Sequence, residues 1–564
     1  MTIDIFRSDA ASEPYVVLVS NRVVLPQPDD SPFVTPGTIV ISTVSGKIVF
    51  VATEILPQAS FPASTQYEDY GKMFLIPGLV DAHVHLNEPG RTEWEGFATG
   101  TRAAASGGVT TVIDMPLNAI PPTTTLDGFK VKLAAAQNQC WVDVGFYGGV
   151  IPGNADQLLP LVEAGVRGFK GFLIESGVEE FPAVSQEDIQ LAMKTLKDTP
   201  TTLMFHAEMI PPITDSVGDA VARSEPPLAP KGDLNSYRTF LESRPQVFET
   251  YAIAEIIEQA HLAPQLHLHI VHLSATAAIP MLRKARADGV NITAETCFHY
   301  LGLASDFIED GDTRHKCCPP IREQSNQDKL WDELLAGEDS CIRTVVSDHS
   351  PCTPELKLLP DHLAVQNQDQ NSAMIRRPSL LHNDSGIDMT LPREKKSGDN
   401  CCSSNHEHSE HAAELSHVQQ DAAAGPQGQG DFFAAWGGIS SVGLGLPILH
   451  TTALKRGAPL SITDIVRLCC QATAQQVGLS HRKGALKVGM DGDVCVFDDE
   501  EQWVLRAGDM KWKNKCSPWE GHSFKGRVKA TWLRGKQVYQ HGGVNGGFVS
   551  GKPVGEAITE RRVV

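Results

Sequence analysis

The sequence predicts an α/β fold, a (β/α)8 TIM-like barrel that carries a small β-sandwich domain formed by the N- and C-terminal segments. Three observations predict it: strand-like runs and helical stretches alternate through the middle of the chain, short strand-like runs occur at both ends, and metal-capable side chains end several of the central runs. A chain of 564 residues has room for a barrel of about 250 residues and a second domain.

The two chain ends share a texture that is typical of small sheets. Short apolar runs bounded by Pro, Asp and Gly occur near the N-terminus as "YVVLVSNRVVL", "GTIVIST" and "KIVFVAT". The same texture returns near the C-terminus in "DVCVFD", "EQWVLRA" and "VKATWLRGKQVYQHG". We expect residues 1–72 and 484–564 to form one β-sandwich domain, with a tail at the C-terminus.

Between these ends, eight apolar runs predict the barrel strands. They are near-continuously apolar because barrel strands are buried on both faces. An open doubly wound sheet is the structural alternative, but no G-x-G-x-x-G follows the first strand to support a dinucleotide site. We expect the barrel to span residues 73–357 and 431–483, with strands in "FLIPGLVDAHVH", "VTTVIDMP", "CWVDVGFYGGV", "GVRGFKGFLI", "TTLMFHAE", "LHLHIVHLS", "VNITAETCF" and "CIRTVVSDHS".

Residues 358–430 interrupt this pattern. The stretch contains no Phe, Trp or Tyr and is rich in Gln, Ser, His, Asp and Ala, so it cannot bury much apolar surface. Its "CCSSNHEHSEH" could be a metal-binding tract, but it lacks ordered flanks that would fix ligand geometry. The sequence therefore predicts a disordered low-complexity insertion here.

Charge and cysteine content narrow the function classes. The formal net charge of -20 and the pI near 5.4 oppose attraction to nucleic acid or to an anionic membrane, which favours a small-molecule partner. There is no apolar span of about 18 residues and no signal-peptide core at the N-terminus. The 12 cysteines lack a disulfide-framework spacing, which predicts reduced thiols and a cytoplasmic protein.

Candidate functional residues gather at the ends of the predicted barrel strands. The first run ends with His83 and His85, the fourth carries Lys170, the fifth His206, the sixth His272 and the eighth Asp348. An isolated H-x-H pair would more simply be a surface or core pair. In (β/α)8 enzymes, however, the C-terminal strand ends form the active-site rim, so these six side chains should meet there. A metal site is the better interpretation.

Four histidines and one aspartate suit Zn2+, and they exceed what one catalytic zinc ion keeps, which implies two metal ions. Lys170 lies in an apolar setting that would lower its pKa and leave an amine able to react with CO2. A carbamylated (N6-carboxylated) Lys170 would then bridge the two ions. A Schiff-base lysine and a lysine that reaches to solvent remain alternatives. In "LHLHIVHLS", His272 ends the strand, whereas His267 and His269 lie early and are expected to be hydrogen-bonded core residues.

Several stretches now resemble known signatures in the right order, among them "PGLVDAHVHL", "GFKGFL", "HAE", "IVHLS", "SDHSPC", "GALKVGMDGDVCVFD" and "KNKCSPWEG". The chain resembles the amidohydrolase superfamily, in its cyclic-amidase branch of dihydroorotases, dihydropyrimidinases, hydantoinases and allantoinases. The resemblance implies two metal ions, usually zinc. It assigns His83, His85 and Asp348 to one ion, His206 and His272 to the other, and carbamylated Lys170 to both. It also implies a homo-oligomer, a tetramer or dimer.

The residue two positions after the second histidine of "HVH" separates the enzymes of this branch by substrate. Dihydroorotases typically carry Arg two residues after the second histidine, and Asn87 stands there in this sequence. Loss of that cation disfavours a carboxylate-bearing ring and suits a neutral ring with a ureido group. Together with "HVHLNEPGRTEWEGF", "KCCPPIR" and "GDFFAAWGGISS", this looks most similar to allantoinases, which implies hydrolysis of allantoin to allantoate.

Alternatives to this activity remain open. A hydantoinase or dihydropyrimidinase is the nearest alternative enzyme, followed by a dihydroorotase. A non-catalytic interaction protein of the dihydropyrimidinase-like type is an alternative of another class, but such relatives have lost metal ligands, whereas this chain retains all six. The implied mechanism uses Asp348 as the base that takes a proton from water and then as the acid that gives it to the leaving ring nitrogen.

Four further residues are candidate substrate contacts. Asn118 follows the second strand, Cys317 precedes "PPIR" and Ser350 stands beside Asp348, while Arg91 could position an anionic or ureido group. For Asn118 and Arg91, a loop hydrogen bond and a surface charge are equally good interpretations. A nucleophilic role for Cys317 is disfavoured because a metal-activated water already provides the nucleophile.

Overall fold

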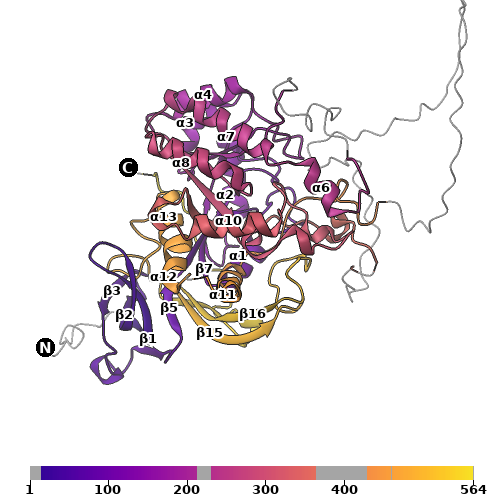
Figure 1. Cartoon of the computed structure of the whole chain (residues 1–564). Coiled ribbons are helices and arrows are strands. Elements are labelled where there is room, and N and C mark those ends of the chain that lie inside the picture. Colours follow the sequence, from indigo (N-terminus) through magenta and orange to yellow (C-terminus); the bar gives the residue numbers. More distant parts are fainter. Residues whose placement is uncertain (1–13, 213–229, 362, 364–427, 459, 563–564) are drawn as a thin grey trace, which may run out of the picture.

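The computed structural model describes residues 14–212, 230–361, 363, 428–458 and 460–562. Most of the predicted insertion at 358–430 therefore lies outside the described residues. Figure 1 shows two parts: a strand-and-helix body in the upper half, and a sheet below it to which strands from both ends of the chain contribute.

Parallel strands form the body, and each lies within one of the eight predicted runs. They form one sheet in the order β6-β7-β8 and another in the order β9-β10-β11-β12-β13-β14, and the third run, which contains both β8 and β9, connects the two sheets. A parallel bridge between Val84 and His349 joins the last strand to the first, which closes the barrel and confirms the fold prediction. The strands are β6 (Leu79–Val84), β7 (Val109–Asp114), β8 (Asp143–Phe146), β9 (Gly148–Gly149), β10 (Phe169–Phe172), β11 (Thr202–His206), β12 (His267–Ile270), β13 (Ile292–Cys297) and β14 (Ile342–Val346).

Helices follow the strands around the outside of the barrel (Figure 1). α4 shows why: Ile189, Ala192, Met193 and Leu196 recur at helical spacing and are buried, and Ser185 closes the N-terminus in a capping box with Asp188. Within the described residues, no helix is long and apolar enough to span a membrane. The helices are α1 (Phe97–Ser106), α2 (Leu126–Ala136), α3 (Ala155–Glu163), α4 (Gln186–Leu196), α6 (Tyr237–Ser243), α7 (Val247–Gln259), α8 (Ile279–Ala287), α9 (Phe298–Gly302), α10 (Gln324–Leu334), α11 (Gly445–Arg456), α12 (Ile462–Val466) and α13 (Ala472–Gln476).

Both chain ends build one eight-stranded sheet, as predicted. Its order is β17-β16-β15-β5-β1-β2-β3, with β4 beside β1. Val16 and Leu18 pack in one cluster and Val17 and Val19 in another, so alternation buries both faces of β1. The strands are β1 (Tyr15–Pro26), β2 (Pro32–Ser42), β3 (Ile48–Ala52), β4 (Gln66–Asp69), β5 (Phe74–Pro77), β15 (Val494–Val504), β16 (Ser523–Leu533) and β17 (Lys536–Gln540).

The first predicted barrel run is divided between the two parts. β5 pairs with β1 and β15 in the sheet, whereas β6 begins the barrel. The break falls at Gly78, where a Cβ atom would lie 2.2 Å from the Thr110 hydroxyl oxygen, and it follows Pro77, which has no N–H for a ladder. The expected domain boundaries remain a prediction, but this run connects the two domains directly.

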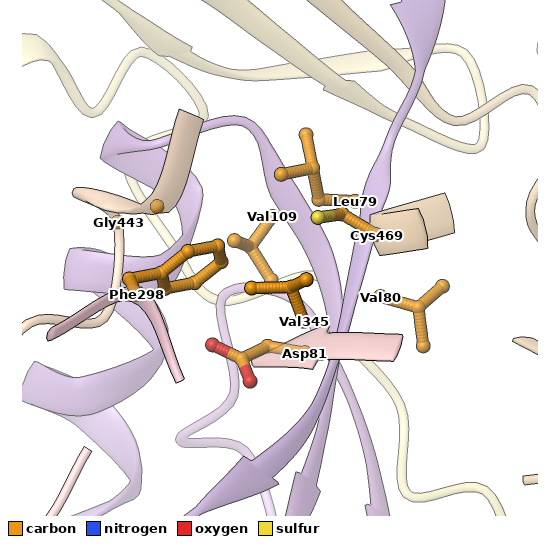
Figure 2. Close-up of a pocket in the computed structure, with 9 residues that line it drawn as sticks. Leu79, Val80, Asp81, Val109, Phe298, Val345, Gly443 and Cys469 are labelled. Carbon is orange, nitrogen blue, oxygen red and sulfur yellow. The ribbon is translucent and has the colours of Figure 1, made fainter. Parts of the chain in front are cut away.

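A small, mostly apolar cavity lies against the start of β6. Figure 2 shows the Asp81 carboxylate beside the aliphatic side chains of this cavity. Asp81 accepts hydrogen bonds from the backbone N–H groups of His83 and Ser347, at 3.3 and 3.2 Å, and burial raises the pKa of Asp81 to about 6. The cavity is lined by none of the predicted site residues, so it is not a candidate substrate pocket.

Candidate metal centre

The barrel brings the six predicted ligands to one rim. His83 lies in β6 and His85 just after it, Lys170 lies in β10, and His206 is the last residue of β11. His272 and Asp348 each follow the end of a strand, β12 and β14, by two residues. Because all these strands are parallel, their carboxyl ends meet at the same end of the barrel.

Three of these side chains converge in a first group, His83, His85 and Asp348, whose ligand atoms lie within 4.8 Å of one another. Oδ1 of Asp348 is 3.2 Å from Nε2 of His83 and 3.5 Å from Nε2 of His85. Nε2 of His83 is buried without a hydrogen-bond partner among the described residues. An imidazole lone pair that is buried next to a carboxylate and a second imidazole is well suited to a divalent cation.

A second pair forms beside the first. Nδ1 of His206 lies 3.1 Å from Nε2 of His272, and the ring centroids of His83 and His272 are 5.4 Å apart. Burial lowers the pKa of both His206 and His272, and the nearby Lys170 charge lowers both further, so both rings are neutral at pH 7. Neutral imidazoles with facing nitrogens are what a metal ion requires.

Lys170 lies on β10, the strand that pairs with the strand of His206. The pKa values of His85, His206 and His272 are lowered first by burial and further by the Lys170 charge. The side chain is 1% exposed, and burial lowers the pKa of Lys170 to about 8. A fraction of this amine on the order of a tenth is therefore neutral at pH 7, which is the form that reacts with CO2.

Two buried carboxylates contact the histidines, and sequence reasoning missed both. Glu208 Oε2 lies 2.8 Å from Nε2 of His206 and also pairs with Arg244. Glu295 Oε1 lies 2.5 Å from Nδ1 of His83. Burial alone would raise the pKa of Glu295, but its contacts with His83 and His269 lower it to about 2. Such carboxylate–histidine contacts typically orient metal ligands, so the donor set fits a two-metal centre.

The predicted substrate contacts lie around this centre. Ser350 Oγ donates to Oδ1 of Asp348 at 2.8 Å, and Asn118 Nδ2 lies 3.4 Å from Nδ1 of His85. The Arg91 guanidinium donates to the Asn118 carbonyl at 2.9 Å and forms an ion pair with Glu180, so its charge is already paired. Cys317 is buried, and burial raises the pKa of its thiol well above the usual value, which agrees with a non-nucleophilic residue.

Comparison with known proteins agrees with this geometry. Residues 74–337 match a model of the Amidohydrolase family, and residues 445–539 match a second Amidohydrolase family model. An allantoinase of Saccharomyces cerevisiae is 43% identical over 93% of this chain and 96% of its own length. An allantoinase of Streptomyces avermitilis is 36% identical over 94% of this chain and 97% of its own length. This chain belongs to the allantoinase family.

The fold of this allantoinase-family chain is also found in solved structures. An L-hydantoinase (dihydropyrimidinase) from Arthrobacter aurescens superposes with a TM-score of 0.73 and covers 97% of this chain and 99% of its own. Its sequence identity is 24%, so this likeness concerns the fold. Together with the family matches, it confirms the barrel and identifies a hydrolase of the amidohydrolase type.

Within this allantoinase-family rim, Asn87 and Asn118 share an uncommon arrangement. Both adopt left-handed backbone conformations, with φ of 61° and 65°, which Asn tolerates better than most residues. Both side-chain oxygens are buried without a hydrogen-bond partner among the described residues. Asn87 Nδ2 donates to the Pro351 carbonyl at 3.3 Å, which fixes the orientation of its amide. The rim therefore has two amide oxygens, one on Asn87 and one on Asn118, that can accept hydrogen bonds from a ligand.

Proposed function

We propose that this chain hydrolyses the ring amide of allantoin to give allantoate. Water adds to the amide carbonyl carbon, the ring C–N bond breaks, and the nitrogen leaves with a proton. The observation that carries the proposal is the convergence of ligand side chains from five strand ends on one rim, in a chain of the allantoinase family. The neutral imidazoles and ionised carboxylate found there suit a hydrolytic metal centre.

Two divalent ions, which we propose to be zinc, would be held by the two groups described above. His83, His85 and Asp348 would hold one ion, and His206 and His272 the other, with carbamylated Lys170 contributing to both. When bound, such a pair of ions supplies Lewis acidity that activates water and polarises the amide carbonyl. The burial of all six side chains keeps competing water away from the ligand atoms.

Asp348 is the proposed proton carrier. Burial alone would raise the pKa of Asp348, but its contacts with the His83, His85 and His272 imidazoles, among them a hydrogen bond from His85, hold it well below the usual value. The carboxylate is therefore ionised at neutral pH and can accept a proton from the attacking water. Ser350 donates to its Oδ1 and limits its rotation, so the same carboxyl group can deliver the proton to the departing ring nitrogen.

The substrate would be recognised by acceptors rather than by a cation. The free oxygens of Asn87 and Asn118 match the N–H groups of a ureido substituent and of a neutral ring. The Arg91 charge is paired with Glu180, so it shapes the rim and is not offered to a carboxylate. A site of this kind favours allantoin over dihydroorotate, whose carboxylate would lack a partner.

The test is ring-opening hydrolysis by the full-length protein loaded with zinc in the presence of bicarbonate. Allantoin, hydantoin, dihydrouracil and dihydroorotate are compared by kcat/KM. We expect allantoin to be preferred by at least tenfold, about 1.4 kcal/mol of differential transition-state binding. Preference for another ring would overturn the substrate but retain the site, and no turnover of any ring would favour the interaction-protein alternative.

The assembly and compartment are further parts of the proposal. We propose a homo-oligomer, a tetramer or dimer, which light scattering coupled to size-exclusion chromatography would test directly. A monomeric mass would contradict it. We also propose a cytoplasmic location, on the basis of cysteine usage, which fractionation of the source cells would test.

A further inference from the structure

Glu295 contacts two metal-ligand residues that come from different strands. It lies in β13 and is fully buried in the barrel interior. Its Oε1 is 2.5 Å from Nδ1 of His83 and accepts a hydrogen bond from the backbone N–H of His272 at 3.3 Å. Its Oε2 lies 3.1 Å from Nε2 of His269. One carboxylate thus touches a residue of each proposed metal group.

The hydrogen bonds at the Glu295 carboxylate have a fixed direction. A carboxylate accepts, so Nδ1 of His83 and Nε2 of His269 must each carry a proton. On the far side of His269, Nδ1 lies 2.7 Å from the Thr293 hydroxyl, which also lies 2.7 Å from Nε2 of His267. Both imidazole N–H groups therefore point toward Glu295, and Nε2 of His83 faces Asp348.

The contact with His272 concerns the backbone. His272 has a φ of 38°, in the left-handed region that residues other than glycine rarely adopt. Such a conformation persists only where surrounding contacts hold it, and the Glu295 carboxylate accepts from its N–H. The direction in which the His272 side chain leaves the strand therefore depends on the same carboxylate that selects the tautomer of His83.

We propose that Glu295 is a positioning residue that fixes His83 and His272 together, and with them the spacing of the two metal groups, and that His269 in turn holds Glu295 in place. The inference rests on the proposed metal centre, but it concerns the support beneath that centre rather than the substrate. It also gives His269, which lies below the rim, the role of holding the Glu295 carboxylate in place.

The first test replaces Glu295 with glutamine in the full-length protein loaded with zinc or with cobalt. The introduced amide keeps the size of the side chain but replaces one of its two acceptor oxygens with an N–H2 group, so at least one of the three donors loses its acceptor. We expect metal loss to a chelator to be about 10- to 100-fold faster in Glu295→Gln and the visible absorption spectrum of the cobalt form to change. The matched control is Glu333→Gln, another buried carboxylate, which pairs with Arg283 and the Cys341 backbone.

Substitutions at His269 provide the second test. Leucine cannot donate to Glu295, whereas glutamine can, so His269→Leu should shift metal retention and the cobalt spectrum in the same direction as Glu295→Gln. His269→Gln should restore most of the wild-type behaviour. If His269 only stabilised the fold, the two variants would change metal retention and the cobalt spectrum alike. Those changes would then follow the thermal unfolding temperatures of the variants. This pair also carries the test if Glu295→Gln does not fold.

The outcome that overturns the inference is wild-type metal retention and an unchanged cobalt spectrum in folded Glu295→Gln or His269→Leu protein. Effects no larger than those of Glu333→Gln would overturn it as well. Because metal content and the spectrum are measured without substrate, this failure is distinct from failure of the proposed function, which would appear as wild-type metal binding without hydrolysis of allantoin.

Discussion

The Asp348 carboxylate lies against His83, with Oδ1 3.2 Å from Nε2, and so joins the first strand of the barrel to the eighth. The two strands are neighbours only because the barrel closes, at the bridge between Val84 and His349. Asp348 itself has a φ of 43°, which turns its side chain toward the rim just beyond β14. Closure of the barrel therefore also brings His83 and Asp348 together in the first metal group.

We predict that Asp348→Asn lowers kcat for allantoin by about 100- to 10,000-fold, because an amide cannot accept the proton of the attacking water. The control is Ser350→Ala, which removes one hydrogen bond to Oδ1 and should cost about tenfold or less. Steady-state kinetics at saturating zinc check both variants. Activity of the Asp348→Asn protein within tenfold of wild type would exclude this residue as the proton carrier.

We predict that Lys170→Ala loses activity by on the order of a thousandfold, because alanine has no amine that could take up CO2 and supply the bridging carboxylate. Propionate or another short carboxylic acid should restore part of the activity and of the bound metal. Lys170→Arg is the control: its guanidinium stays charged and cannot take up CO2, so it should stay inactive with or without the acid. Equal activity of Lys170→Arg and wild type would contradict carbamylation.

The sequence predicts the rim well because two simple rules convert order along the chain into position in space. Alternating strands and helices predict a barrel, and the carboxyl ends of barrel strands meet. Residues as distant in sequence as His83 and Asp348 can therefore be predicted to lie close together. The same rules exclude His267 and His269 from the rim, and the structure places both in hydrogen bonds with Thr293 below it.

The supporting residues could not be predicted in this way. Glu295 stands inside an apolar run, and its contact with His83, 212 residues away, depends on the registers of β12, β13 and β14 and on barrel closure. Glu208 had a weak signal, two residues after His206 in "HAE", but only the structure shows that its carboxylate turns back to the ring. The pairing of Arg91 with Glu180 likewise depends on where two loops meet.

Asn87→Gly should separate substrate binding from folding. Glycine adopts the φ of 61° without strain, so the free energy of unfolding should fall only by about 1 kcal/mol for the lost hydrogen bond to the Pro351 carbonyl. Loss of the buried acceptor oxygen should lower kcat/KM for allantoin by about 10- to 100-fold. Steady-state kinetics and thermal unfolding, measured on the same sample, check the expected kcat/KM and the expected stability. Unchanged kcat/KM would show that Asn87 does not contact the substrate.

A buried ion network at Lys483 predicts a pH dependence of stability. Nζ of Lys483 pairs with Asp143, Asp491 and Asp493 at 2.7, 3.0 and 2.6 Å. Burial alone would raise the pKa of Asp491, but the Lys483 charge and hydrogen bonds from Lys47 and Lys483 hold it well below the usual value. Burial alone would lower the pKa of Lys483, but the three carboxylates hold it well above the usual value.

The two pKa shifts determine how the stability of the protein changes with pH. The Asp491 contribution is present above an unfolded pKa of about 3.9 and is lost as pH falls through its lower folded value. The Lys483 contribution is present below about pH 10.4 and is lost as pH rises through its higher folded value. Between these limits, we predict that Lys483→Met costs about 3 kcal/mol of unfolding free energy, because buried carboxylates lose a partner.

Urea unfolding of Lys483→Met between pH 4 and 8 checks this prediction. In the variant the buried carboxylates lack the cation, so burial raises their pKa and they take up protons above pH 4. The loss relative to wild type should therefore shrink toward pH 4. The control is Lys487→Met, which removes an exposed pair with Asp30 and should change stability by no more than about 0.5 kcal/mol. A loss that is independent of pH would mean that packing, rather than charge, explains the effect.

The described ends of the predicted insertion lie side by side. The Gly430 N–H donates to the Leu358 carbonyl at 2.5 Å, and Gln429 Nε2 donates to Asp361 at 3.2 Å. A linker of about six Gly and Ser residues can therefore replace residues 364–427 without moving either end. We predict that this deletion leaves kcat/KM for allantoin within about twofold of wild type, because contacts among the described residues already hold the rim side chains.

The control deletion extends from 364 to 438. It removes the hydrogen bonds from the backbone N–H of Trp436 to Leu356 and from that of Gly438 to Lys316, which hold the returning chain beside Ser350. Because it also removes the buried Phe432 and Phe433 and the backbone that packs against Ser350, this longer deletion should abolish activity even if the protein folds. Loss of activity in the shorter deletion, with metal content and thermal stability unchanged, would instead assign the insertion a direct part in catalysis.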